Sequence, residues 1–295
     1  MEDQIRKALE FLRQDLRMEE EAAALYARQA EEMEEGWLRR IFLENVADEE
    51  RHAEIFRYAI DRVEYSAANP TVSTGIDELD DILYGGVPEG YAVILISPPL
   101  DERDLLTEGF LRDGVDRDEA VLLITTRLRG VASGLATERP DRFYLMLCSP
   151  RADLMVGDGP NVLKFQGVEN LTQLNIALER FLRGISERGG GPRRVVLDIV
   201  SDTLLTHELR VARSWLTDLL TMLKAGDATV LSTLDPGMHS RDEARTVIDL
   251  FDGHMDIEER EADGERRRTL TVRRLYGKKY LDRELVLDRD RLTRR

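Results

Sequence analysis

Apolar residues recur at helical spacing through the first 68 positions of the chain. Separations of three and four residues place them on one side of a helix. Gly36 interrupts the pattern and predicts the end of a first helix, and Pro70 ends a second, because proline cannot continue a helix. The pattern therefore predicts an antiparallel hairpin of two helices. Its two apolar stripes comprise Ile5, Leu9, Leu12, Leu16, Ala23, Tyr26 and Ala30, then Leu38, Phe42, Asn45, Phe56, Ala59 and Val63.

Three ionisable residues interrupt these stripes. Glu19 falls in the first stripe, and Glu49 and His52 fall in the second. An unpaired carboxylate in an apolar seam costs several kcal/mol or takes up a proton, whereas a shared metal ion satisfies several such groups at once. Glu49 and His52 are three residues apart and so lie on one side of their helix. We therefore expect these three residues to be metal ligands.

The residues of the seam resemble those of the ferritin-like and rubrerythrin-like families, and most closely the two-helix encapsulated ferritins. The resemblance rests on Glu19 seven residues before Tyr26 and on the run Asp48-Glu49-Glu50-Arg51-His52-Ala53. It implies that each hairpin supplies half of a di-iron site, which a second copy completes with six protein ligands in all. Such ligands suit iron or manganese better than zinc. The alternative is that Glu-x-x-His arises by chance in a Glu-rich helix and binds no metal.

From Thr71 onward the pattern changes to short apolar runs separated by turns and helical segments. Alternating strands and helices predict an α/β domain with a mainly parallel sheet and helices on both faces. The last runs, Asp252–Ile257 and Arg268–Val272, predict a C-terminal hairpin that turns at Asp263-Gly264. The predicted organisation is a helical hairpin at 1–68, a linker at 69–72, an α/β domain at 73–283 and a charged tail at 284–295.

The start of this region resembles the KaiC and RadA branch of the RecA-type ATPases. The resemblance rests on Ser73-Thr74-Gly75-Ile76, on the turn Gly85–Gly90 and on the apolar run Tyr91–Ile96, and it extends to about residue 280. It implies a phosphate loop, G-x-x-x-x-G-K-[ST], directly after that run. The glycines of such a loop let backbone amides surround phosphate, the lysine supplies charge and the hydroxyl holds Mg²⁺. Here the segment reads Ser97-Pro98-Pro99-Leu100-Asp101-Glu102-Arg103-Asp104-Leu105, without these glycines, the lysine or the hydroxyl.

Other positions that the resemblance assigns to nucleotide chemistry have changed as well. Arg103 occupies the lysine position but is expected to pair with neighbouring carboxylates. Asp198 stands where the family holds Mg²⁺, although a strand-end residue kept for hydrogen bonding is the alternative. Arg127-Leu128 replaces the acidic pair that activates water, and Tyr276 replaces a basic residue. We therefore expect a vestigial nucleotide site at Arg103 and Asp198, and neither ATP with Mg²⁺ as a cofactor nor ATP hydrolysis.

The net charge of −16 argues against nucleic acid as the main partner, because that binding needs clustered Lys and Arg. Cys148 is the only cysteine in the sequence, so neither an intrachain disulfide nor a cysteine metal cluster can form. No run of about 18 apolar residues is present, and we expect a cytoplasmic protein without a membrane span. His207, His239 and His254 have no visible partners and are expected to be structural.

Three functions remain open. The first is a KaiC-like regulatory scaffold that does not hydrolyse ATP and whose paired hairpins hold a di-iron site. The second is a ferroxidase or peroxide-consuming di-iron enzyme assembled by an inactive RecA-like domain. The third is a metal-free oligomerisation arm on an unusual nucleotide-binding domain. All three imply association of the chain with itself, and metal analysis separates the third from the others.

Overall fold

The computed structural model describes residues 2–262 and 265–289 and divides into two compact units, Met1–Pro70 and Thr71–Arg295. The division falls inside the segment 69–72 that the sequence predicts as a linker. Among the helices of the described residues, none is long and apolar enough to cross a membrane.

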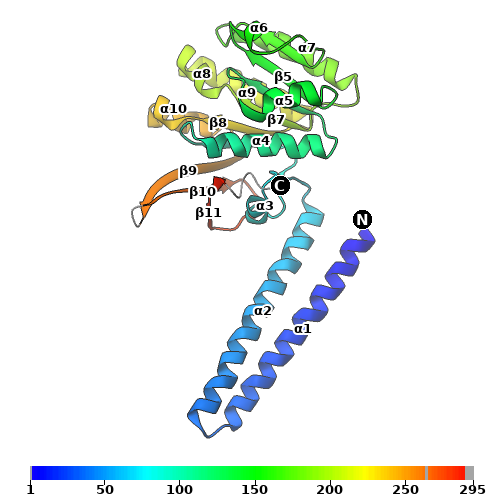
Figure 1. Cartoon of the computed structure of the whole chain (residues 1–295), viewed down its shortest axis with the longest axis vertical. Coiled ribbons are helices and arrows are strands. Elements are labelled where there is room, and N and C mark those ends of the chain that lie inside the picture. The colour runs from blue at the N-terminus through cyan, green and yellow to red at the C-terminus, as the bar shows by residue number, and fades with distance from the viewer. Residues whose placement is uncertain (1, 263–264, 290–295) are drawn as a thin grey trace. The chain divides into compact units, whose positions relative to one another are not determined.

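The N-terminal unit is an antiparallel pair of long helices, α1 (Glu2–Glu32) and α2 (Gly36–Ala68), which lie side by side (Figure 1). Ala30 and Ala53 are buried in the seam, where small side chains let the helices approach, and most other seam residues are only partly covered. Gly36 begins α2 instead of ending α1, so its predicted role is wrong. Nothing lies within 4 Å of a Cβ placed on Gly36, which shows that packing does not require a glycine there.

The second unit alternates strands and helices along the chain. A short antiparallel pair, β1 (Thr71–Val72) and β2 (Val87–Pro88), flanks α3 (Asp77–Ile82). The strands of the main sheet are β3 (Ala92–Ile96), β4 (Val121–Thr125), β5 (Phe143–Cys148), β6 (Val162–Phe165), β7 (Arg194–Asp198), β8 (Thr229–Leu234), β9 (Gly253–Ala262), β10 (Glu265–Leu275) and β11 (Glu284–Val286). The helices around it are α4 (Asp101–Asp116), α5 (Gly130–Glu138), α6 (Ala152–Met155), α7 (Leu171–Ser186), α8 (Val200–Thr206), α9 (Leu209–Ala225) and α10 (Arg241–Ile248), with a 3-10 turn at Pro236–Met238.

Within the described residues, nine strands form the main sheet in the order β11-β10-β9-β3-β8-β7-β4-β5-β6. Neighbours from β9 to β6 are parallel, and β10 is antiparallel to both β9 and β11. The central strands are mostly apolar and are buried throughout, so both faces of the sheet must be covered. Residues of α3 to α6 form the core on one face, and residues of α7 to α10 form it on the other (Figure 1). The predicted mainly parallel fold with a C-terminal antiparallel hairpin is confirmed.

The sheet continues beyond the predicted end of the domain. Strand β11 pairs with β10 through Leu270 and Leu285, inside the segment 284–295 that the sequence assigns to a charged tail. Three residues with one half-buried side chain are too few to show a period of two, which is why the strand is not evident in the sequence. The predicted turn Asp263-Gly264 and residues 290–295 lie outside the described residues.

The turn leading into β3 depends on one buried carboxylate and one glycine. The backbone N–H and the hydroxyl of Thr74 both donate to Asp80 Oδ1 at 2.7 Å. Gly86 has a φ of 127°, and a Cβ there would lie 2.2 Å from the carbonyl oxygen of Val72, so only glycine fits. This turn anchors β3, whose carboxyl end carries the segment where a phosphate loop is expected.

Candidate metal centre and the end of strand β3

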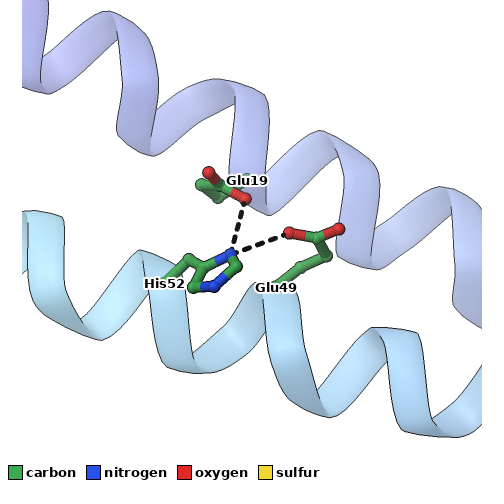
Figure 2. Close-up of side chains that lie close together, drawn as sticks. All are labelled: Glu19, Glu49 and His52. Carbon is green, nitrogen blue, oxygen red and sulfur yellow. Dashed lines mark hydrogen bonds and ion pairs between the residues drawn. The ribbon is translucent and has the colours of Figure 1, made fainter.

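Three side chains meet in the middle of the hairpin. Glu19 comes from α1, Glu49 and His52 come from α2, and one ligand atom of each lies within 4.8 Å of the others. His52 Nδ1 is 3.3 Å from Glu49 Oε2 and 3.6 Å from Glu19 Oε2. Figure 2 shows one oxygen of each carboxylate directed at the imidazole ring. The structure therefore places together all three residues that the sequence selects as candidate ligands.

The cluster is reached from solvent on one side. The side chains of Glu19 and Glu49 are 25% and 21% exposed, whereas that of His52 is 51% exposed. The seam of a single hairpin thus covers the two carboxylates more than the imidazole. The apolar stripes predict that Glu19, Glu49 and His52 are buried. A single hairpin does not bury them, so another protein surface would have to cover the exposed side of the cluster.

The two carboxylates of the cluster repel each other. The side-chain hydrogen bond with Glu49, partial desolvation and the charge of Glu49 raise the pKa of Glu19, and His52 opposes this shift. A cation placed between the two carboxylates would relieve this repulsion.

The donor set and its spacing fit a metal ion of the iron or manganese type. Metal–ligand distances of about 2.1 Å put neighbouring donors about 3 Å apart, close to the separations of His52 Nδ1 from the two carboxylate oxygens. Two carboxylates and one imidazole leave coordination positions for further ligands. Three protein ligands are half of the four-Glu, two-His set that holds two metals in helical bundles.

The segment after β3 has no backbone suited to wrapping phosphate. Helix α4 begins at Asp101, and none of residues 97–105 has a positive φ; Leu100, just before the helix, has a φ of −118°. The first turn carries Asp101, Glu102 and Asp104. Negative side chains match the positive end of a helix, which is the position that phosphate occupies in a working loop.

The charged residues of this turn are engaged with one another and with the sheet. Glu102 is buried, and both of its carboxylate oxygens accept hydrogen bonds from Arg268 of β10, at 2.6 and 2.7 Å. Arg103 is also buried and pairs with Asp104 at 3.3 Å, as the sequence predicts. The cation at the lysine position therefore has a carboxylate beside it.

Asp198, at the end of β7, is held by hydroxyl groups of two neighbouring strands. It accepts hydrogen bonds from Thr125 Oγ1 at 3.1 Å and Thr233 Oγ1 at 2.5 Å. The cavity between Asp198 and Arg103 is about 50 Å³, far below the roughly 300 Å³ or more of typical ligand sites. An open hollow of about 470 Å³ lies beside it, and acidic residues outnumber basic ones in its lining. These contacts favour a structural role for Asp198.

The α/β unit is similar to known proteins in both sequence and fold. A family model described as ATPase: KaiC matches residues 153–288. The crystal structure of a KaiC-like protein from Pyrococcus horikoshii matches with a TM-score of 0.58 at 19% identity, covering 75% of this chain and 95% of that one. The α/β unit therefore has a KaiC-like fold, and we call it the KaiC-like domain. The residues that carry the metal cluster lie outside the segment matched by the family model.

Two relatives extend the comparison with this KaiC-like domain. A UPF0273 protein of Pyrococcus furiosus is 25% identical over 214 residues, which cover 70% of this chain and 85% of that protein. The circadian clock protein KaiC2 of Synechocystis sp. is 25% identical over 233 residues, which cover 77% of this chain but only 39% of KaiC2. The chain therefore spans less than half of the KaiC2 protein that it matches.

Some polar contacts of the KaiC-like domain are not evident in the sequence. Arg194 is 1% exposed and donates hydrogen bonds to Asp113 and Glu119, although it opens an apolar strand. His254 Nε2 lies 2.5 Å from Asp256 Oδ1, so the prediction that His254 has no partner is wrong. Residues two apart on a strand share a face, and that spacing is the signal that could have found this pair.

Proposed function

We propose that the chain is a KaiC-like scaffold protein that does not hydrolyse ATP, and that its hairpin holds iron or manganese at one half of a dinuclear site. The convergence of Glu19, Glu49 and His52 within 4.8 Å carries this proposal. The acidic, glycine-free start of α4 and the small cavity at Asp198 support the absence of hydrolysis. A second copy of the hairpin would supply the remaining three ligands.

Iron binding under anaerobic conditions tests the metal site. Full-length protein is mixed with Fe²⁺, desalted and analysed for iron. We expect about one iron per chain, because two hairpins would hold two metals. Glu49→Ala should lose at least about tenfold in occupancy or affinity, since one of three ligands is removed.

Glu50→Ala is the matched control, because Glu50 is the next residue of α2 and is exposed. It should bind as much iron as the unaltered chain. Protein that stays free of iron and manganese, or equal loss in the two variants, would contradict the proposal and leave the hairpin as a metal-free arm.

A ferroxidase is the second candidate, and the half-exposed imidazole favours it because O₂ and Fe²⁺ can approach the cluster from solvent. In that reaction two Fe²⁺ each lose one electron, and O₂ takes up both electrons and two protons to form H₂O₂. Oxygen uptake that continues over many equivalents of Fe²⁺ and disappears in Glu49→Ala would favour the enzyme. Iron that binds without sustained uptake would favour the scaffold.

A further inference from the structure

One face of the hairpin is apolar although it lies in solvent. Phe11, Met18 and Leu25 of α1 recur every seven residues and so lie on one side of that helix. They are 53%, 59% and 45% exposed. Ile41 and Ile55 of α2, fourteen residues apart, are exposed to a similar extent, at 45% and 59%. We call these five residues the apolar face.

The two helices repeat one sequence pattern 30 positions apart, the separation of Glu19 and Glu49. Two antiparallel helices with the same pattern are related by a pseudo-two-fold axis perpendicular to the plane that contains both helix axes. Rotation about this axis keeps equivalent positions on the same face of the hairpin. By this relation the exposed residues of α1 and α2 form one continuous surface. The equivalent pairs are Phe11 and Ile41, Leu12 and Phe42, Glu19 and Glu49, Ala23 and Ala53, Leu25 and Ile55, and Tyr26 and Phe56.

The other side of the hairpin has a different character. Salt bridges join Arg13 to Glu64 at 2.5 Å and Arg57 to Glu20 at 2.7 Å. Glu20 is two residues, or about 200°, around α1 from Met18, which places these bridges away from the apolar face. The salt bridges thus lie on the side of the hairpin away from the apolar face, and that side also exposes Leu43, at 49%.

The apolar face is arranged symmetrically about the metal cluster. Phe11 and Ile41 precede Glu19 and Glu49 by eight residues, about 12 Å along each helix, and Leu25 and Ile55 follow them by six, about 9 Å. Because α1 and α2 run in opposite directions, Phe11 lies level with Ile55, and Leu25 with Ile41. Two apolar layers thus flank the cluster at similar distances.

We propose that the apolar face binds a second copy of the same face, with a two-fold axis that crosses the helices at the level of Glu19 and Glu49. The layer of Phe11 and Ile55 in one copy then meets the layer of Leu25 and Ile41 in the other, as an isologous interface requires. The same rotation brings the exposed side of His52 toward the partner's cluster. This inference rests on the proposed function, because the incomplete metal site is the reason to expect a second copy. It adds the surface through which the two copies bind and their relative orientation.

Cysteine cross-linking tests the interface without reference to metal. Cys148 is 2% exposed, and burial raises the pKa of its thiol to about 12, so it stays unreactive at neutral pH. Met18→Cys places a thiol beside the proposed axis. Ala24→Cys is the control, because Ala24 is exposed and lies about 240° around α1 from Met18.

Full-length variants are treated with a short bismaleimide, once with Fe²⁺ and once with a chelator. We expect covalent dimers of Met18→Cys to exceed those of Ala24→Cys by about tenfold or more. Equal yields, or no dimer from Met18→Cys, would overturn the proposed face. Because Met18 is exposed, the substitution should leave the fold intact, which circular dichroism checks.

The two proposals fail separately. Selective dimers of Met18→Cys in protein that binds no metal would support the interface and refute the metal site. Conversely, iron binding that depends on Glu49, together with equal cross-linking of Met18→Cys and Ala24→Cys, would support the metal site and refute the interface. Leu25→Lys gives an independent measure, since a lysine in the interface should convert a dimer into a monomer in light scattering.

Discussion

Single buried polar groups hold the KaiC-like domain together at points where elements meet. Arg194 donates to the carbonyl oxygens of Ser73 and Phe110, at 2.8 and 3.0 Å, and to the carboxylates of Asp113 and Glu119. Its guanidinium also stacks on the ring of Phe110. Burial alone would raise the pKa of Asp113, but Arg117 and Arg194 lower it overall. An arginine in an apolar strand is thus fully paired.

Asp80 is expected to make stability depend on pH. Burial raises its pKa to about 6, against hydrogen bonds from Ser73 and Thr74 that lower it. The folded pKa exceeds the unfolded value, so the contribution to stability is present below about pH 4 and is lost as pH rises through 6. The free energy of unfolding, relative to that of Asp80→Asn, should fall by about 2 kcal/mol between pH 4 and 7.

Urea unfolding followed by the fluorescence of the buried Trp215 measures this difference, in a background where the exposed Trp37 is replaced by Phe. Glu78→Gln is the control, since Glu78 is exposed on the same helix. A difference between Asp80→Asn and the unaltered chain that does not change with pH would show that Asp80 stays ionised.

Elements with a clear repeat were predicted well from the sequence. The spacing of apolar residues located α1 and α2, and the apolar runs located β3 and the start of β9. Strand β11 was not predicted, because three residues are too few to show the alternation of buried and exposed side chains that marks a strand. The convergence of Glu19, Glu49 and His52 followed from helix spacing, but the partial exposure of the seam depends on how many helices surround it.

Helix α4 should prevent nucleotide binding. Its first turn carries three acidic residues, which repel a triphosphate, and the cavity between Asp198 and Arg103 is only about 50 Å³. Calorimetry with Mg-ATP should therefore give no dissociation constant below about 1 mM. A micromolar dissociation constant that rises in Arg103→Ala and stays unchanged in Arg117→Ala, where the altered residue is exposed, would show that a nucleotide binds at this turn after all.

At the scale of the whole molecule, metal binding and self-association should be linked. If each chain holds half of a site, a metal that prefers the complete site stabilises the dimer, and dilution weakens metal binding. Iron occupancy at a fixed ratio of iron to protein should therefore rise with chain concentration over about a hundredfold range. Occupancy that does not change with chain concentration would indicate a site complete within one hairpin.

The contacts in the first turn of α4 also determine which substitutions would be needed for this turn to bind phosphate. A lysine at Arg103 would still lie beside Asp104, and removing Glu102 would leave Arg268 without the carboxylate that accepts its hydrogen bonds. Glycines in place of Pro98 and Leu100 would loosen the start of the helix before any phosphate contact repaid the loss. Each of these changes costs stability or leaves a charge unpaired, so several substitutions would have to occur together before this turn could hold phosphate.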